Sequence, residues 1–151
     1  MDMNVAYLDD LLARGASTTP DAVLLESEDR QWTYAQVERL AERGARWLEE
    51  AGVLPGDRVL VMGDNSDGFL VGVLAVLRAG AVAIPVSPHV AQDLLPVIVA
   101  STTPTAVFAA PRELHRWSAT LTGLARRGFP ELLSGEGRGA PPRRRARGEA
   151  A

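Results

Sequence analysis

Apolar residues recur at helical spacing in five segments of the chain. After Thr33 they fall at positions i, i+3, i+4, i+8 and i+11, which places them on one face of a helix. Thr33 and Gln36 fit a capping box, in which the two residues satisfy each other's backbone donors. Residues 69–77 are apolar on nearly all sides, so we expect a buried helix, capped by Asn65 or Ser66. Other helices are expected at residues 5–14, at 112–124, and at 91–100, where Pro96 predicts a kink or a weaker second half.

Five short apolar runs are suited to strands. The first two flank a turn at Glu28 and Asp29, which predicts a hairpin. From residue 58 to residue 110, strands and helices alternate, and this order predicts right-handed crossovers and a parallel sheet. We therefore expect an α/β fold. The runs cover residues 22–26, 30–33, 58–62, 81–86 and 106–110.

The composition changes after Arg126. Residues 134–148 are rich in glycine, proline and arginine, and they cannot bury enough apolar surface to offset the entropy of ordering. We expect a folded domain over residues 1–126 and a disordered basic tail over residues 127–151. Residues 138–151 hold five arginines and one glutamate, whereas the residues before them carry a net charge of −7. Because the body is acidic and the tail is short, we expect no nucleic-acid partner.

All 16 basic residues are arginines, and the chain has no cysteine. Mechanisms that need a lysine, a thiolate or a cysteine-bound metal are therefore excluded. His89 and His115 lie far apart in the sequence without a neighbouring ligand or base, so we expect no metal site. The start of the chain lacks a leader pattern, and the longest apolar stretch, residues 69–77, is too short to span a bilayer. We expect a cytoplasmic protein without a membrane partner.

Gly63 and Gly68 have the spacing of the glycines in a Walker A loop. The positions that should hold lysine and serine or threonine are apolar, however, and Asp64 and Asp67 would repel a phosphate. A polar loop that caps the following helix is the favoured interpretation, and a phosphate loop is the alternative.

Arg112 and Arg116 lie four residues apart, which places both on one face if the stretch is helical. Two guanidinium groups on one face can hold a phosphate, whereas a solvated charged face is the commoner interpretation of such a pattern. The arginines at 126–127 and 143–145 leave similar alternatives, and those at 143–145 could also contact anionic lipid or nucleic acid.

Five segments taken together resemble the N-terminal portion of the ANL superfamily of adenylate-forming enzymes, which includes acyl- and aryl-CoA ligases, peptide-synthetase adenylation domains and luciferases. Residues 32–37 resemble the family's first core motif, L-T-Y-x-E-L, and residues 52–59 resemble G-V-x-P-G-D-R-V. Each segment alone consists largely of turn, cap and packing residues, but their order and spacing are specific. The five segments are residues 19–23, 32–37, 52–59, 65–69 and 77–88.

The resemblance implies a parallel-sheet fragment of the family's large N-terminal domain. It also implies a parent reaction in which ATP activates a carboxylate to an acyl-AMP, which is then transferred to a CoA or carrier thiol. In the family, the phosphate loop with its lysine, the adenine and ribose contacts and the second catalytic lysine come later in the sequence. This chain has none of them, so we assign no catalytic residue. We expect a truncated member that is inactive alone and binds no cofactor, whereas full-length members use ATP, Mg²⁺ and CoA.

The resemblance also makes Arg112 and Arg116 candidates for the CoA phosphate, because some CoA ligases of the family use arginines in about this region. Apolar surface that later elements would cover predicts self-association, or binding to a complementary ligase chain or a carrier protein. The alternative to a truncated ligase is therefore a non-catalytic interaction module or one half of a split enzyme. Residues 4–8 and 85–88 lean toward the benzoate-CoA ligase-like branch.

Overall fold

A computed structural model describes residues 5–27, 30–64 and 66–134, which form helices and strands in alternation. The segment 135–151, the larger part of the expected disordered tail, lies outside the described residues. The helices are α1 (Val5–Thr18), α2 (Tyr34–Glu50), α3 (Asp67–Arg78), α4 (Pro88–Thr102), α5 (Pro111–Arg116) and α6 (Phe129–Ser134). The strands are β1 (Val23–Ser27), β2 (Arg30–Thr33), β3 (Arg58–Met62), β4 (Val82–Val86), β5 (Ala106–Ala109) and β6 (Ala125–Gly128).

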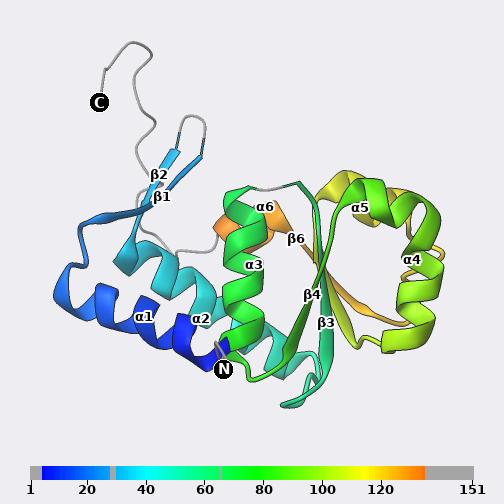
Figure 1. Ribbon diagram of the computed structural model, residues 1–151, viewed down its shortest axis with the longest axis horizontal. Coiled ribbons are helices and arrows are strands. Elements are labelled where there is room, and N and C mark those ends of the chain that lie inside the picture. Colours follow the sequence, from blue (N-terminus) through cyan, green and yellow to red (C-terminus); the bar gives the residue numbers. More distant parts are fainter. Residues whose placement is uncertain (1–4, 28–29, 65, 135–151) are drawn as a thin grey trace, which may run out of the picture.

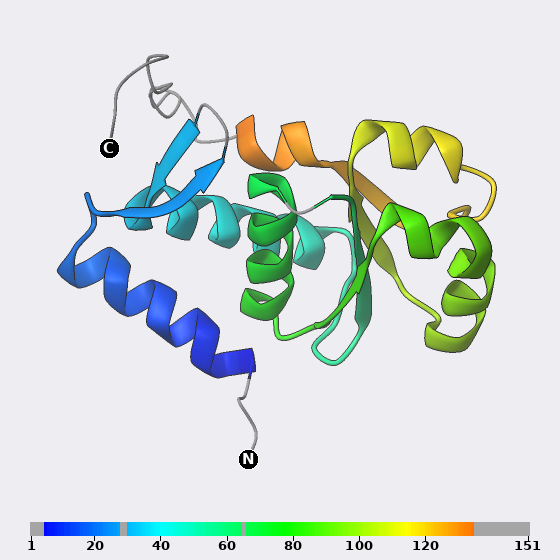
Figure 2. The ribbon, with the colours of Figure 1, turned by 45° about the horizontal axis from the view of Figure 1, so that its top comes forward.

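The strands form two separate sheets. β1 and β2 pair as an antiparallel hairpin, whereas the other four strands form a parallel sheet in the order β4-β3-β5-β6. Helices α2, α3 and α6 lie on one face of the parallel sheet, and α4 and α5 lie on the other (Figure 1). The hairpin and α1 extend the α2–α3 side away from the sheet (Figure 2). The α/β fold with a parallel sheet, expected from the sequence, is confirmed.

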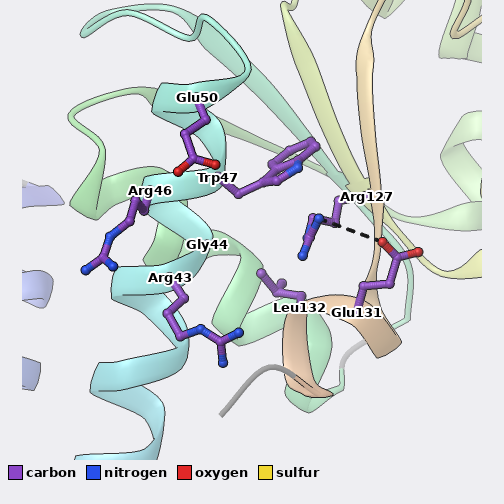
Figure 3. Close-up of a pocket in the computed structure, with 8 residues that line it drawn as sticks. All are labelled: Arg43, Gly44, Arg46, Trp47, Glu50, Arg127, Glu131 and Leu132. Carbon is purple, nitrogen blue, oxygen red and sulfur yellow. Dashed lines mark ion pairs between the residues drawn. The ribbon is translucent and has the colours of Figure 1, made fainter. Parts of the chain in front are cut away.

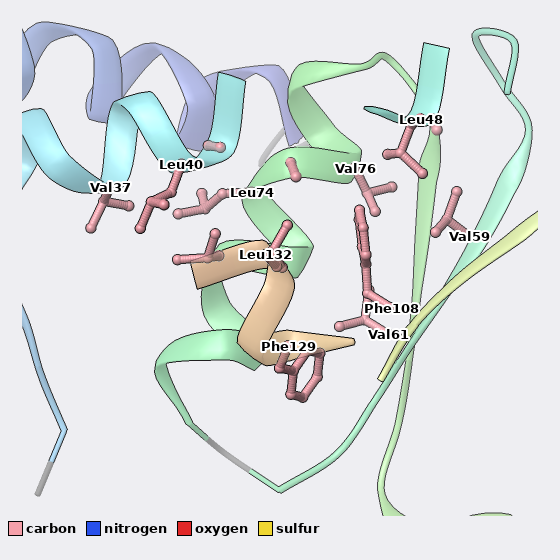
Figure 4. Packing of buried hydrophobic residues seen from close by; sticks show 14 of the residues in the cluster. Val37, Leu40, Leu48, Val59, Val61, Leu74, Val76, Phe108, Phe129 and Leu132 are labelled. Carbon is pink, nitrogen blue, oxygen red and sulfur yellow. The ribbon is translucent and has the colours of Figure 1, made fainter. Parts of the chain in front are cut away.

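The central strand β3 is apolar along its whole length because both of its faces are covered. Val59 and Val61 pack into the cluster beneath α2 and α3, and Leu60 and Met62 pack into the cluster beneath α4. All four side chains are fully buried. Figure 4 shows the first cluster, in which Phe108 of β5 lies beside Val61. A continuous apolar run in a parallel strand has this origin, since successive side chains point to opposite faces.

The helix starts follow the expected capping chemistry. Gln36 donates its backbone N–H to Thr33 Oγ1 at 3.2 Å, and Thr33 donates its own to Gln36 Oε1 at 2.8 Å, so the capping box is confirmed. Ser66 caps α3 by accepting the N–H of Phe69 at 3.2 Å. Helix α4 begins earlier than expected, because Ser87 caps it and proline is tolerated in a first turn. It also continues through Pro96 to Thr102.

The fold extends past residue 126, where the sequence predicts the end of the domain. Strand β6 pairs with β5, and α6 adds Phe129 and Leu132 to the core. The helix expected over 112–124 is shorter, because α5 ends at Arg116 and turns follow it. The helices and strands of the described part therefore continue to Ser134. Strand β6 has the sequence Ala-Arg-Arg-Gly, and no apolar alternation marks it as a strand.

Candidate functional site

The carboxyl ends of the parallel strands are the place where ligands bind in open α/β sheets. From β3 the chain continues to β4 on one side, whereas β5 lies on the other side of β3 and is followed by β6 farther out. The crevice between the carboxyl ends of β3 and β5 is therefore the favoured position for a ligand. The loop after β3 carries Gly63 and Asp64, and β5 leads to Ala110. This loop is also the one with the glycine spacing of a phosphate loop.

Phe129 occupies the space beside both glycines of that loop. A Cβ atom at Gly63 would lie 2.5 Å from Phe129 Cε2, and one at Gly68 would lie 2.6 Å from Phe129 Cβ. The ring is 7% exposed and belongs to the main core cluster (Figure 4). The glycines are thus required for the close approach of an aromatic ring, and the interpretation of the segment as a loop that caps a helix agrees with the structure. The described residues do not form a phosphate loop here.

Asp67, at the first position of α3, is buried and accepts two hydrogen bonds. Trp32 donates Nε1–H to Asp67 Oδ2 at 3.0 Å, and Gly68 donates its backbone N–H to Oδ1 at 2.9 Å. Trp32 lies on β2 and is 1% exposed, so this pair joins the hairpin to the start of α3. The aspartate therefore positions structural elements. Sequence reasoning missed the pair because 35 residues separate its members.

The segment resembling G-V-x-P-G-D-R-V is also accounted for by structure. Gly56 has a φ of +85°, a left-handed conformation that glycine adopts without strain. Asp57 Oδ2 accepts the backbone N–H of Leu54 at 2.9 Å, which closes the turn. Arg58 donates Nε–H to Thr102 O at 2.8 Å and Nη2–H to Thr103 O at 3.0 Å, so it satisfies carbonyl groups at the end of α4. These residues shape the scaffold between β3 and α4.

Both arginines proposed for a CoA phosphate lie on the surface of α5. Arg112 and Arg116 are exposed, and the Arg116 guanidinium lies 5.3 Å from the ring centroid of Trp117. His89 and His115 are exposed as well. The helical spacing expected for the two arginines is present, and their role as phosphate ligands stays a prediction.

A basic hollow lies between α2 and the β6–α6 segment, and we call it the Arg127 pocket (Figure 3). The Arg127 guanidinium lies 5.3 Å from the centroid of the Trp47 ring and 4.0 Å from the Glu131 carboxylate. The hollow has a volume of about 240 Å³. Sequence reasoning missed it, because Trp47 and Arg127 lie 80 positions apart and only the packing of α2 on the sheet brings them together. Its lining residues are Arg43, Gly44, Arg46, Trp47, Glu50, Arg127, Glu131 and Leu132.

The described residues contain neither a cluster of metal-binding side chains nor a helix that could span a membrane. Within residues 5–27, 30–64 and 66–134, no three His, Asp or Glu side chains cluster as metal ligands. None of the helices in the described part is long and apolar enough to cross a membrane.

Comparison with known proteins identifies one family. The family model described as "AMP-binding enzyme" matches residues 12–137. Bacitracin synthase 3 of Bacillus licheniformis is 35% identical over 89 residues, which is 59% of this chain and 1% of that protein. Polyketide synthase PksN of Bacillus subtilis (strain 168) is 32% identical over 108 residues, which is 72% of this chain and 2% of that protein. The chain thus spans a small part of these relatives.

Solved structures share the fold. A putative long-chain-fatty-acid CoA ligase from Rhodopseudomonas palustris CGA009 has a TM-score of 0.73 at 24% identity, covering 85% of this chain and 36% of that one. The nonribosomal peptide synthetase FmoA3, with α-methyl-L-serine-AMP bound, has a TM-score of 0.76 at 23% identity, covering 85% and 14%. These relatives are peptide and polyketide synthases and a CoA ligase, so the lean toward a benzoate-CoA ligase-like branch stays a prediction.

Proposed function

Because the chain belongs to the AMP-binding enzyme family of adenylate-forming enzymes, we propose that it supplies part of the large N-terminal domain of such an enzyme and does not catalyse by itself. The parent reaction is the ATP-dependent activation of a carboxylate to an acyl-AMP, followed by transfer to a CoA or carrier thiol. The filling of the glycine loop by Phe129 carries this proposal, because it leaves the described residues without a cradle for a nucleotide phosphate.

The roles of the family-like segments support the same proposal. Thr33, Arg58 and Ser66 cap helices, and Asp67 binds the indole of a buried tryptophan. Their polar groups are engaged in holding the scaffold together, so none is left in position to act on a substrate. The family's ATP, Mg²⁺ and thiol would be bound mainly by residues outside the described part.

Carboxylate-dependent exchange of pyrophosphate into ATP tests the proposal. We expect the purified 151-residue chain to give no exchange and no hydroxamate above background with a panel of aryl and fatty acids. A full-length CoA ligase of the family, assayed in parallel, controls for the conditions. Turnover by the chain alone with any acid would contradict the proposal.

The exposed residues Arg112 and Arg116 of α5 concern the binding of the thiol substrate. In a chimaera that joins this chain to the later part of a related CoA ligase, we propose that Arg112 and Arg116 contact a phosphate of CoA. Replacing both with alanine should raise the KM for CoA and leave acyl-AMP formation unchanged. Replacing the exposed Arg14 of α1 is the matched control. An unaltered KM for CoA would refute the assignment.

A second candidate, an interaction module or one half of a split enzyme, is favoured by a specific surface. Val90, Leu94 and Val97 of α4 are 44%, 49% and 61% exposed and lie at i, i+4 and i+7, which places them on one side of the helix. Pull-down of the chain from its native host tests this candidate. Recovery of a ligase chain or carrier protein supports it, and recovery of no specific protein counts against it.

A further inference from the structure

The two edges of the parallel sheet differ in their capacity to accept another strand. Val82 donates its backbone N–H to Asp57 O at 2.7 Å, so it points toward β3. Because these groups alternate along a parallel strand, Ala83 and Pro85 point away from the sheet. Proline has no N–H, and its place on the outer side is typical of a strand that ends a sheet. The β4 edge is therefore poorly suited to a further strand.

The β6 edge has no such block. Ala125 donates its backbone N–H to Thr105 O at 3.2 Å, so it points toward β5, and the N–H group of Arg126, an exposed residue, points outward, whereas Gly128 at the end of the strand is buried. Within residues 66–134 no strand follows β6 in the sheet order. The outward N–H and C=O groups of an exposed edge residue such as Arg126 are those to which a further strand can add.

The charge beside this edge selects the added strand. The side chain of Arg127 points toward α2, because its guanidinium lies over the ring of Trp47. It forms part of the lining of the Arg127 pocket (Figure 3). The pocket lining holds three arginines and two glutamates, a net charge of +1. Glu131 is paired with Arg127, and Arg46 is paired with Glu42, which lies outside the lining, whereas no acid of the described part pairs with Arg43. A residue of the added strand that lies beside Arg127 would project from the same face of the sheet. An acidic side chain at this position would lie near Arg127 and Arg43.

We propose that the β6 edge binds an extended, acidic polypeptide segment of a partner, which continues the sheet and places a carboxylate in the Arg127 pocket. This inference rests on the proposed function only in naming the partner, which is the remaining part of the adenylate-forming enzyme. A second copy of the chain fits less well, because its own β6 would place Arg126 and Arg127 against the same arginines of the first copy. The chain's own residues 138–151 also fit poorly, since they hold five arginines and one glutamate.

A titration of the full chain with two designed peptides tests the proposal. The first is a seven-residue peptide of alternating valine and glutamate, and the second has lysine in place of glutamate. We expect the glutamate peptide to slow amide hydrogen exchange at Arg126, with Ala83 unchanged. It should bind about tenfold more tightly than the lysine peptide, the effect of two cross-strand charge pairs. Equal binding, slowing at Ala83, or no saturable binding at millimolar concentration would overturn the proposal.

Two pairs of variants separate the backbone contact from the charge. Arg126→Pro removes an outward N–H without removing a bond to β5, and should abolish binding. Ala83→Pro, the equivalent change on the β4 edge, should not. Arg127→Glu should reverse the preference between the peptides, whereas Arg14→Glu on α1 should not. Circular dichroism establishes that each variant is folded, and if Arg126→Pro unfolds the chain, Arg127→Glu still decides.

Two controls identify other outcomes. If exchange at Arg126 slows with rising chain concentration and no peptide, a second copy occupies the edge and the proposal is wrong. The result does not depend on catalysis, so a chain that is inactive in pyrophosphate exchange and binds neither peptide would refute the edge proposal alone.

Discussion

Helices α3 and α4 are both largely apolar, yet the protein buries them to different degrees. They lie on opposite faces of the same sheet. Seven of the twelve residues of α3 are buried, because α1, α2 and α6 surround it in addition to the sheet. On α4, Leu95 is buried, and Val90, Leu94 and Val97 remain exposed. The comparison shows that the cover supplied by neighbouring elements decides burial, and that the described residues supply an outer layer on one face only.

The same substitution on the two helices gives the sharpest contrast. Val71 of α3 is fully buried, so Val71→Asp places a charge in the core without a partner. We expect a loss of at least about 4 kcal/mol, a large part of the about 5–15 kcal/mol that stabilises a typical domain. Val97→Asp on α4 should change the stability by no more than about 0.5 kcal/mol. Urea unfolding followed by circular dichroism measures both losses of stability. Equal losses would contradict the conclusion that α3 is more deeply buried than α4.

Removal of the Phe129 ring tests the packing of the core on the α3 side of the sheet, at the carboxyl ends of the strands. Phe129→Ala should cost about 3–5 kcal/mol, because it leaves a cavity beside Gly63 and Gly68. Gly63→Ala should destabilise the unaltered chain, in which its methyl group meets the ring. In the Phe129→Ala background the same change should cost much less. The cycle is measured by urea unfolding, and strictly additive effects would show that ring and glycine do not compete for space.

The buried aspartate tests the link between the hairpin and α3. Asp67→Asn replaces one acceptor oxygen by a donor that faces either Trp32 Nε1–H or Gly68 N–H. We expect a loss of about 1–3 kcal/mol in thermal or urea unfolding, since one buried donor is left without an acceptor. Asp64→Asn, on the exposed side of the same loop, is the control and should have little effect. Equal stability of the two variants would contradict the structural role of Asp67.

The smallest effect on stability is expected at the exposed α4 surface. Changing Leu94 to glutamine removes the middle of the apolar stripe and should shift the unfolding free energy by no more than about 0.5 kcal/mol. It should lower self-association, which sedimentation or light scattering measures over a range of concentrations. Leu54→Gln, at an exposed position far along the sequence from α4, is the control. An unchanged association state would show that α4 does not form a contact between copies.

Local sequence signals located much of this fold. The capping box at Thr33 and the cap at Ser66 depend on residues three positions apart, so both could be found in the sequence. Strand β6 could not be found in this way, because its Arg126 and Arg127 become strand residues only through pairing with β5. Arg112 and Arg116 could be placed on one face, but whether a phosphate reaches them depends on residues outside the described part. The Arg127 pocket and the Trp32–Asp67 hydrogen bond likewise needed long-range packing.

The sequence by itself determined the alternation of strands and helices, their main caps and the membership of the adenylate-forming family, because these depend on periodicity and on short segments in a specific order. Only the tertiary structure decided why Gly63 and Gly68 are glycines, which of two apolar helices is covered within the described part, and which edge strand of the described sheet directs a backbone N–H outward. Each of these depends on atoms that are distant in sequence: the ring of Phe129, the layer of α1, α2 and α6, and the direction of the Pro85 and Arg126 backbone groups. Contacts of this kind arise from the packing of whole elements, and no local pattern encodes them.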